Sequence, residues 1–332
     1  MSKKTIIIAE IGVNHNGSLK LAKEHIIEAS KAGADFVKFQ LFKSNQLSTI
    51  DAKKAEYQIN LTKKEETQLQ MLKSLELSNS SFLELRDFAK KNNVGFCASA
   101  FNETGLNFLK KINVDFIKIP SGEITNYPFL KTISKSKIPL VLSTGMSNLN
   151  EIKKSLELLK VSKSKLTLLQ CNSSYPTPFC DANLRVINSL REIFKVEVGF
   201  SDHTLGIEAS IAAVALGASM IEKHLTLDKT LDGPDHKASV EPKEFKEMCS
   251  SIRNIEIALG DGIKKCNNSE IKNKKIVRRS IVAKTDIKKG DKLTSKNLTT
   301  KRPGIGISPM NWETVLDKKA IKNFRKDEII KL

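Results

Sequence analysis

Short runs of apolar residues recur along the chain, and most of them end in a polar side chain that can take part in chemistry. Eight such runs lie at residues 5–9, 35–37, 94–98, 116–117, 139–142, 166–169, 196–200 and 218–221. Between them, apolar residues recur at helical spacing, most clearly at 19–32, 80–90, 151–159, 184–194, 206–216 and 242–259. Strands that alternate with helices of this length predict parallel βαβ units.

The polar residues that end or follow these runs predict where a site lies. They are Glu10, Lys38, Gln40, Ser99, Lys118, Ser121, Glu123, Ser143, Gln170, Cys171, Ser201, His203, Glu222 and His224. Reactive groups at the C-terminal ends of eight strands are typical of a (β/α)₈ (TIM) barrel, whose active site lies at that face. We therefore expect an α/β enzyme.

The chain divides into three parts by its pattern. Residues 1–260 match the length of one barrel. Residues 261–276 are polar and rich in Lys and Asn, which predicts a linker, and residues 277–332 form short segments typical of a small domain. Such a domain is marginal alone, so we expect it to dock on the barrel or on a partner subunit. The long connection at 41–75 is expected to be a loop that acts as a substrate lid.

Composition narrows the class. The net charge of +18 comes mostly from dispersed Lys, and aromatic residues make up only 6% of the chain, so we predict a solvated surface rather than a nucleic-acid interface. A positive field still attracts an anionic substrate. We expect no membrane span, no signal peptide and a cytoplasmic location. The five cysteines lack Cys-x-x-Cys spacing, and we interpret Cys97 and Cys171 as buried structural thiols.

Two lysines are expected to point into the barrel mouth. Lys38 and Lys118 could form an anion cradle with nearby serine hydroxyls, act as Schiff-base nucleophiles, or pair with Glu10 in a structural salt bridge. For Glu10, a functional role is favoured over a structural salt bridge, because the polar residues Asn14, His15 and Asn16 follow it in the loop. The anion cradle is the interpretation we prefer for the lysines.

His203 and His224 end neighbouring predicted strands. Two imidazoles at such positions can share one divalent ion. Glu10, Glu222 and Asp235 would then favour Mn²⁺ or Mg²⁺ over structural zinc. His25, on a predicted helix, is interpreted as structural, and the loop at 232–239 as either a turn or a substrate contact.

At these residues the chain resembles the sialic-acid (nonulosonate) synthase family over essentially its whole length. The matching stretches are Glu10-Ile-Gly-Val-Asn-His-Asn-Gly-Ser18, Lys38-Phe-Gln40, Lys118-Ile-Pro-Ser-Gly-Glu123, Ser143-Thr-Gly-Met146, Tyr175-Pro-Thr-Pro178, Ser201-Asp-His203-Thr, Glu222-Lys-His224, Gly233-Pro-Asp235 and Lys301-Arg-Pro-Gly304. Residues 277–332 resemble the antifreeze-like (SAF) domain that follows the barrel in this family.

The resemblance implies a metal-dependent condensation of phosphoenolpyruvate with an open-chain N-acylated aminosugar, which releases phosphate. It implies a domain-swapped homodimer in which Arg302 contacts the sugar of the partner's barrel. The catalytic residues it implies are Glu10, Lys38, Lys118 and Glu222, and the metal ligands His203 and His224. The residues implied for phosphoenolpyruvate are Lys38, Ser99, Lys118, Ser121, Ser143, Ser173 and Ser201, and for the sugar Gln40, Glu123, Tyr175, Asp235 and Arg302.

Two departures bear on the branch of the family. Neuraminate synthases often carry Thr-Pro at Ser99-Ala100 and Asn at Ser173, and residues 54–58 look more like the legionaminate branch. We therefore predict an N,N'-diacetyllegionaminate synthase, with N-acetylneuraminate synthase as the alternative. A Schiff-base aldolase and a non-catalytic basic binding protein are the remaining hypotheses.

Overall fold

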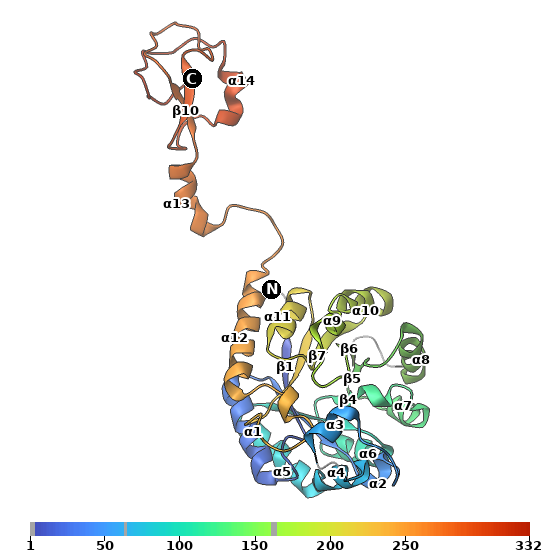
Figure 1. Cartoon of the computed structure of the whole chain (residues 1–332). Helices are drawn as coiled ribbons and strands as arrows, with labels where there is room; N and C mark the ends of the chain where they lie inside the picture. The colour runs from blue at the N-terminus through green and yellow to red at the C-terminus, as the bar shows by residue number, and fades with distance from the viewer. Residues whose placement is uncertain (1–3, 63–64, 161–164) are drawn as a thin grey trace. The chain divides into compact units, whose positions relative to one another are not determined.

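The computed structural model describes residues 4–62, 65–160 and 165–332 and divides the chain into two compact units, Met1–Asp261 and Gly262–Leu332 (Figure 1). The first unit is a closed barrel of eight parallel strands in chain order, with β1 paired to both β2 and β8. The strands are β1 (Ile6–Gly12), β2 (Phe36–Leu41), β3 (Gly95–Ala100), β4 (Ile117–Ile119), β5 (Leu140–Ser143), β6 (Leu166–Cys171), β7 (Glu197–Asp202) and β8 (Met220–His224). The predicted TIM barrel is confirmed.

Helices surround this barrel. They are α1 (Leu19–Ala32), α5 (Asn79–Lys91), α6 (Glu103–Lys111), α7 (Tyr127–Ile133), α8 (Leu149–Leu159), α9 (Phe179–Ala182), α10 (Val186–Phe194), α11 (Glu208–Ala215) and α12 (Pro242–Ala258). The six predicted helices are confirmed to within two residues at each end, whereas α6, α7 and α9 were not predicted. Local chemistry sets the ends: the Ser18 hydroxyl caps the start of α1, and Gly33 ends it at φ 94°.

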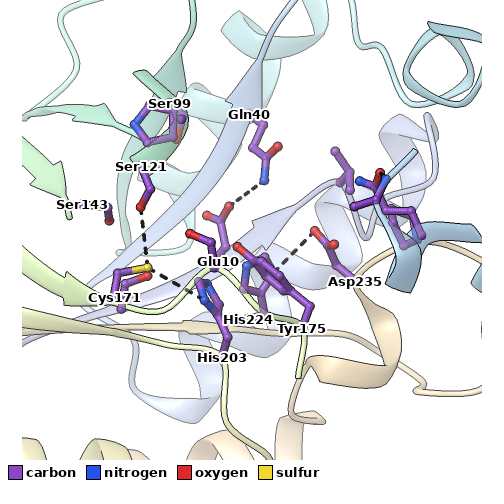
Figure 2. Close-up of a pocket in the computed structure, with 18 of the residues that line it drawn as sticks. Glu10, Gln40, Ser99, Ser121, Ser143, Cys171, Tyr175, His203, His224 and Asp235 are labelled. Atoms are coloured by element: carbon purple, nitrogen blue, oxygen red, sulfur yellow. Dashed lines mark hydrogen bonds and ion pairs between the residues drawn. The ribbon is translucent and has the colours of Figure 1, made fainter. Parts of the chain in front are cut away.

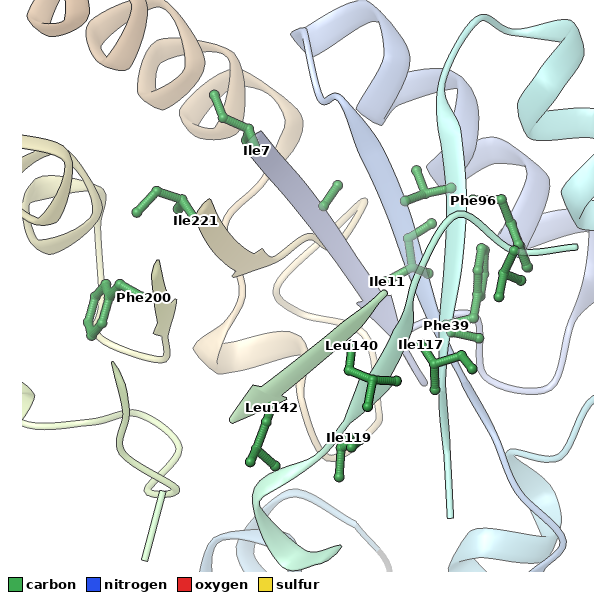
Figure 3. Packing of buried hydrophobic residues seen from close by; sticks show 14 of the residues in the cluster. Ile7, Ile11, Phe39, Phe96, Ile117, Ile119, Leu140, Leu142, Phe200 and Ile221 are labelled. Atoms are coloured by element: carbon green, nitrogen blue, oxygen red, sulfur yellow. The ribbon is translucent and has the colours of Figure 1, made fainter. Parts of the chain in front are cut away.

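The alternation of side chains along each strand divides the core in two. On β1, Ile7 and Ile11 point outward and pack with the helices in the main apolar cluster (Figure 3). Ile8 points inward, where it forms a smaller cluster with residues such as Leu169 and Met220. Glu10 lies two residues further along the same face, so the barrel interior is apolar below and charged at the C-terminal end.

The connection after β2 was expected to be a loop, but it contains three short helices. These are α2 (Ser44–Leu47), α3 (Glu56–Leu61) and α4 (Gln68–Ser74). A capping box between Thr67 and Gln70 starts α4. Met71 and Leu75 then pack with Val13 and Phe42 in a small apolar cluster, which anchors the connection to the barrel.

The second unit has its own apolar core around Ile281, Leu293 and Phe324, beside an antiparallel pair of β9 (Ser280–Ala283) and β10 (Leu298–Lys301). It also contains α14 (Trp312–Val315). The segment predicted as a linker, 261–276, is not extended throughout, because α13 (Asn268–Val277) begins within it at a capping box between Asn267 and Glu270. Among the described residues, no helix is long and apolar enough to cross a membrane.

Candidate active site

A cavity of about 350 Å³ lies at the C-terminal ends of the barrel strands. Most of the residues predicted from the sequence line it: Glu10, Lys38, Gln40, Ser99, Lys118, Ser121, Ser143, Ser173, Tyr175, Ser201, His203, Glu222, His224 and Asp235. Strand register explains their meeting, since Glu10 lies level with both Lys38 and His224 in the neighbouring strands. The structure thus gathers in one layer residues that are far apart in the sequence.

Two lysine–carboxylate pairs form the floor of the cavity. Lys38 Nζ lies 2.8 Å from Glu10 Oε2, and Lys118 Nζ lies 2.7 Å from Glu222 Oε1. Lys38 also lies 3.7 Å from Glu222, so the four side chains form one buried chain of alternating charge. Ser201 donates a hydrogen bond to Glu222, and Lys38 donates one to Ser99. The floor therefore presents both ammonium groups without an uncompensated buried charge.

The two carboxylates differ in acidity. Burial would raise the pKa of Glu222, but Lys118 and Lys38 outweigh it and lower this pKa to about 2. Burial raises the pKa of Glu10, and Lys38 only partly offsets that effect, with Glu222 acting in the same direction as burial. Glu10 is therefore the carboxylate in this floor that more readily accepts a proton.

The lysine charge disfavours Schiff-base chemistry at Lys38. Burial would lower the pKa of Lys38, yet the charges of Glu10 and Glu222 raise it above its ordinary value. A Schiff-base lysine must be neutral to attack a carbonyl, so its pKa has to be lowered rather than raised.

Serine hydroxyls and one glycine form the wall next to Lys118. Ser121 Oγ accepts a hydrogen bond from the Gly145 backbone N–H, and within the described chain the buried Ser143 hydroxyl has no partner. A Cβ at Gly145 would collide with Ser173 Oγ and lie 2.8 Å from Ser121 Oγ, so a larger residue there would displace both hydroxyls. Serine hydroxyls that line the same cavity as two ammonium groups suit a phosphate or a carboxylate.

His203 and His224 lie with ring centroids 5.3 Å apart. His203 Nδ1 is 2.6 Å from the Asn172 carbonyl, which fixes the proton there and leaves Nε2 available. His224 Nδ1 is buried without a hydrogen bond in the described structure and lies 3.8 Å from Asp235 Oδ2 (Figure 2). Burial, followed by the charge of His203, lowers the pKa of His224 well below its usual value, which keeps this imidazole neutral.

This donor set fits a divalent ion in part. Two imidazoles with oriented nitrogens are suitable ligands, and Asp235 lies beside one of them. Burial lowers the pKa of His203, but Cys171 and the Asn172 carbonyl raise it overall, so a proton competes with any metal there. No group of three or more His, Cys, Asp or Glu side chains among the described residues is arranged to hold an ion. Oxygens from water or substrate would have to complete the coordination.

A third buried ion pair lies on the outer side of β7 and β8. Lys223 Nζ is 3.0 Å from Asp202 Oδ2 and donates to the Thr204 carbonyl at 2.6 Å. Asp202 also accepts hydrogen bonds from Thr204 and Ser210. Asp202 and Lys223 are level in the β7–β8 register, and each precedes a histidine, so the pair ties together the strand ends that carry His203 and His224.

Some residues that the sequence predicted for the site do not line the cavity. Glu123 does not line the cavity, and its carboxylate accepts a hydrogen bond from Asn126 instead. Arg302 is exposed in the second unit. Asn14 donates to the Leu225 carbonyl and to Ser239, so the first loop stabilises the loop after β8. His25 is buried and bonded to the Leu21 carbonyl, as expected for a structural histidine.

Several residues that line the cavity were not assigned a site role from the sequence, and two of these are Cys171 and Tyr57. Cys171, interpreted as structural, has its sulfur 3.9 Å from His203 Nδ1 and 3.7 Å from Ser121 Oγ (Figure 2). Tyr57, from α3, stacks on Tyr175 with centroids 5.1 Å apart. Its position within a long polar connection gave no periodic signal, although the resemblance of residues 54–58 to one branch pointed to this segment.

A TIM barrel with paired lysines, serine hydroxyls and two neighbouring histidines at its mouth is the arrangement of an enzyme active site. The chain belongs to the NeuB family, whose model matches residues 25–264, and residues 278–332 match the SAF domain model. These matches confirm the predicted family and the predicted SAF domain.

Individual relatives agree with this assignment. The chain is 53% identical over 332 residues, covering 99% of both proteins, to the N,N'-diacetyllegionaminic acid synthase of Campylobacter jejuni. It is 42% identical to the enzyme of the same name from Legionella pneumophila, covering 97% of this chain and 92% of that protein. The crystal structure of an N-acetylneuraminic acid synthetase from Leptospira borgpetersenii superposes with a TM-score of 0.73 at 36% identity, over 82% of this chain and 90% of that chain.

Proposed function

We propose that the protein is a nonulosonate synthase that condenses phosphoenolpyruvate with 2,4-diacetamido-2,4,6-trideoxymannose to give N,N'-diacetyllegionaminate and phosphate. The observation that carries this proposal is the 53% identity, over the whole chain, to an enzyme of that name. The cavity supports it, because its floor and one wall supply the ammonium and hydroxyl groups that an anionic enol phosphate requires. N-Acetylneuraminate synthase is the alternative, supported by the likeness to the Leptospira structure.

The chemistry forms one carbon–carbon bond and replaces the C2–O bond to phosphate with a C2–O bond to the oxygen of water. C3 of phosphoenolpyruvate attacks the aldehyde carbon of the open-chain sugar, and the aldehyde oxygen takes up a proton. Water then adds at C2, and phosphate leaves with the bridging oxygen. The ammonium groups of Lys38 and Lys118 would hold the phosphate and carboxylate throughout these steps, with Ser99, Ser121, Ser143, Ser173 and Ser201 as hydrogen-bonding partners.

Glu10 is suited to move the proton in the first step. Its raised pKa allows it to carry a proton near neutral pH more readily than Glu222 does. Gln40 donates a hydrogen bond to Glu10 at 3.2 Å and would hold the carboxyl group in place (Figure 2). Glu222 stays ionised and would orient Lys118, which is its closest partner.

His203 and His224 are the residues that would hold a divalent metal. A bound Mn²⁺ or Mg²⁺ would polarise the sugar aldehyde as a Lewis acid. The sugar itself would meet Gln40, Tyr175 and Asp235, which line the cavity beside the two histidines. Glu123 stays a weaker proposal, because its carboxylate is already bonded to Asn126.

A homodimer is the second part of the proposal. The family resemblance implies that Arg302 reaches the sugar in a partner's barrel. Phe179 and Leu205, which follow β6 and β7, are more than half exposed and would give a partner subunit an apolar surface to cover. Arg302→Ala should raise the KM for the sugar at least tenfold, whereas Arg325→Ala, a second exposed arginine in the same domain, should not. An unchanged KM for the sugar would exclude the partner contact.

The reaction itself is tested by phosphate release. The protein is loaded with Mn²⁺ and phosphoenolpyruvate and offered 2,4-diacetamido-2,4,6-trideoxymannose or N-acetylmannosamine in parallel. A higher kcat/KM with the diacetamido sugar supports the proposal, and a higher value with N-acetylmannosamine supports the alternative. Release with neither sugar from folded protein contradicts both.

Covalent trapping tests the remaining rival enzyme. A Schiff-base aldolase would form an adduct on borohydride reduction with a keto acid, and the raised pKa of Lys38 argues against one at that residue.

We further propose a cytoplasmic location, since the five cysteines are all free thiols, as is usual in a reducing compartment. The Lys-rich surface with few aromatics supports the proposal that neither nucleic acid nor a membrane is a partner.

A further inference from the structure

The connection between β2 and α5 contributes an aromatic side chain to a cavity that is otherwise lined largely by polar groups. Tyr57 lies on α3 and lines the cavity together with its neighbour Gln58. Its ring stacks on Tyr175 at an interplanar angle of 23°. Tyr175 in turn packs on the His203 ring, with centroids 4.1 Å apart. Three rings therefore run continuously from the connection to the proposed metal ligands.

This stack has a chemical environment different from that of the floor. The floor holds two ammonium groups and two carboxylates, which suit an anion. Tyr175 already packs against Tyr57 and His203, so the aromatic surface left to a ligand is that of Tyr57, which lines the cavity. Such a surface buries methyl groups and flat, weakly polar groups such as amides.

The Tyr57 hydroxyl makes only a weak polar contact, which does not fix the position of the ring. It accepts a hydrogen bond from Gln58 Nε2 at 3.3 Å, which is near the long limit for such a bond. The position of the ring is set instead by its stacking on Tyr175 and by the backbone of α3, where the Gln58 side chain accepts a hydrogen bond from the Ala55 N–H. The ring face, rather than the hydroxyl, is thus the feature this segment presents.

The two candidate acceptors differ in the groups that such a surface discriminates. The diacetamido sugar carries an acetamido group at C4 and a methyl group at C6, where N-acetylmannosamine carries hydroxyls. We propose that Tyr57 is a specificity-determining residue whose ring packs against the second acetamido group of the acceptor sugar. This inference rests on the proposed function, and it assigns the choice between the two acceptors to the β2–α5 connection.

The test measures kcat/KM for both sugars, with saturating phosphoenolpyruvate and Mn²⁺, in the full-length protein. Tyr57→Ala should lower kcat/KM for the diacetamido sugar by about 10- to 100-fold, the range for losing a hydrophobic pocket contact, and change that for N-acetylmannosamine less than threefold. Tyr57→Phe should keep the preference of the unmodified protein, because the ring remains. Tyr127→Ala, which changes an exposed tyrosine outside the cavity, serves as the matched control.

Each other outcome overturns the inference. Equal losses for both sugars would make Tyr57 a support for the connection rather than a contact of the acetamido group. A loss of preference in Tyr57→Phe would assign the discrimination to the hydroxyl. If Tyr57→Ala does not fold, Tyr57→Leu gives the same test with the volume largely kept, and an unchanged preference there refutes a role for the aromatic face. Failure of the proposed function is separate, since the unmodified protein would then not prefer the diacetamido sugar.

Discussion

The buried pair of Asp202 and Lys223 gives a quantitative prediction about the strand ends that carry the histidines. Lys223 is fully buried, and its ammonium group has two partners, Asp202 and the Thr204 carbonyl. In Lys223→Met the methionine fills most of the volume of the lysine stem, so the cavity contribution is small. The Asp202 carboxylate, however, stays buried without its counter-charge. Removing one member of a buried ion pair costs about 3–5 kcal/mol.

The remaining hydrogen bonds place the expected cost near the lower end of that range. Asp202 keeps three donors after the substitution, the Thr204 N–H, the Thr204 hydroxyl and the Ser210 hydroxyl. We therefore expect Lys223→Met to lower the free energy of unfolding of the barrel by about 3 kcal/mol. Adding Asp202→Asn removes the unpaired charge, so the double variant should regain at least about half of this loss.

The assay is urea unfolding followed by two signals. Trp312 is the sole tryptophan of the chain and lies in the second unit, so its fluorescence follows that unit. Far-UV circular dichroism is dominated by the helices of the barrel. Lys223→Met should shift the dichroism transition and leave the Trp312 transition in place. A loss below about 1 kcal/mol, or a double variant that is the sum of the two single variants, would refute the reasoning.

Three further predictions concern the cavity. His203→Ala should weaken Mn²⁺ binding at least tenfold by calorimetry without lowering the thermal midpoint of the metal-free protein, and unchanged binding would remove the metal assignment. Gly145→Ala should raise the KM for phosphoenolpyruvate at least tenfold, because its Cβ would enter the space of Ser121 and Ser173. Gly105→Ala, in α6 outside the cavity and with no atom nearer than 3.4 Å to its Cβ, should not. Burial, followed by the charge of Glu10, raises the pKa of Asp235 to about 6, so ionising this carboxyl group in the folded protein costs free energy. The free energy of unfolding of the metal-free protein should therefore decrease as the pH rises from about 4 to about 6. Asp235→Asn should remove on the order of 2–3 kcal/mol of that decrease. An identical pH profile in Asp235→Asn would contradict this.

The barrel and its site layer could be predicted from the sequence because both follow from strand periodicity. An apolar strand that ends in Glu10 or Lys118 leaves few arrangements other than a polar layer at one end of a barrel. The chain order of the strands then fixes which residues are neighbours. That is why the serines, lysines and histidines of the sequence prediction line one cavity.

The partners within that layer could not be predicted in the same way. Pairing of Lys38 with Glu10 was one of the alternatives, but Lys118 pairs across the barrel with Glu222, which periodicity does not reveal. Tyr57 and Cys171 were missed for a related reason. Their position in the cavity depends on how a connection folds back and on which way a strand end turns, and both are tertiary effects. The helices within residues 41–75 and 261–276 were missed because polar segments carry little apolar periodicity.

The closed register of the barrel also constrains how such a protein can change. Each strand is held on both sides, so inserting one residue before Glu10 or Lys118 would turn that side chain outward among the helices and break the alternating chain of charge. The connection between β2 and α5 is under no such constraint, because it is anchored by a few apolar side chains rather than by register. Under the proposal made above for Tyr57, exchanging this connection as a unit would alter the accepted sugar and leave the charged floor of the cavity unaltered.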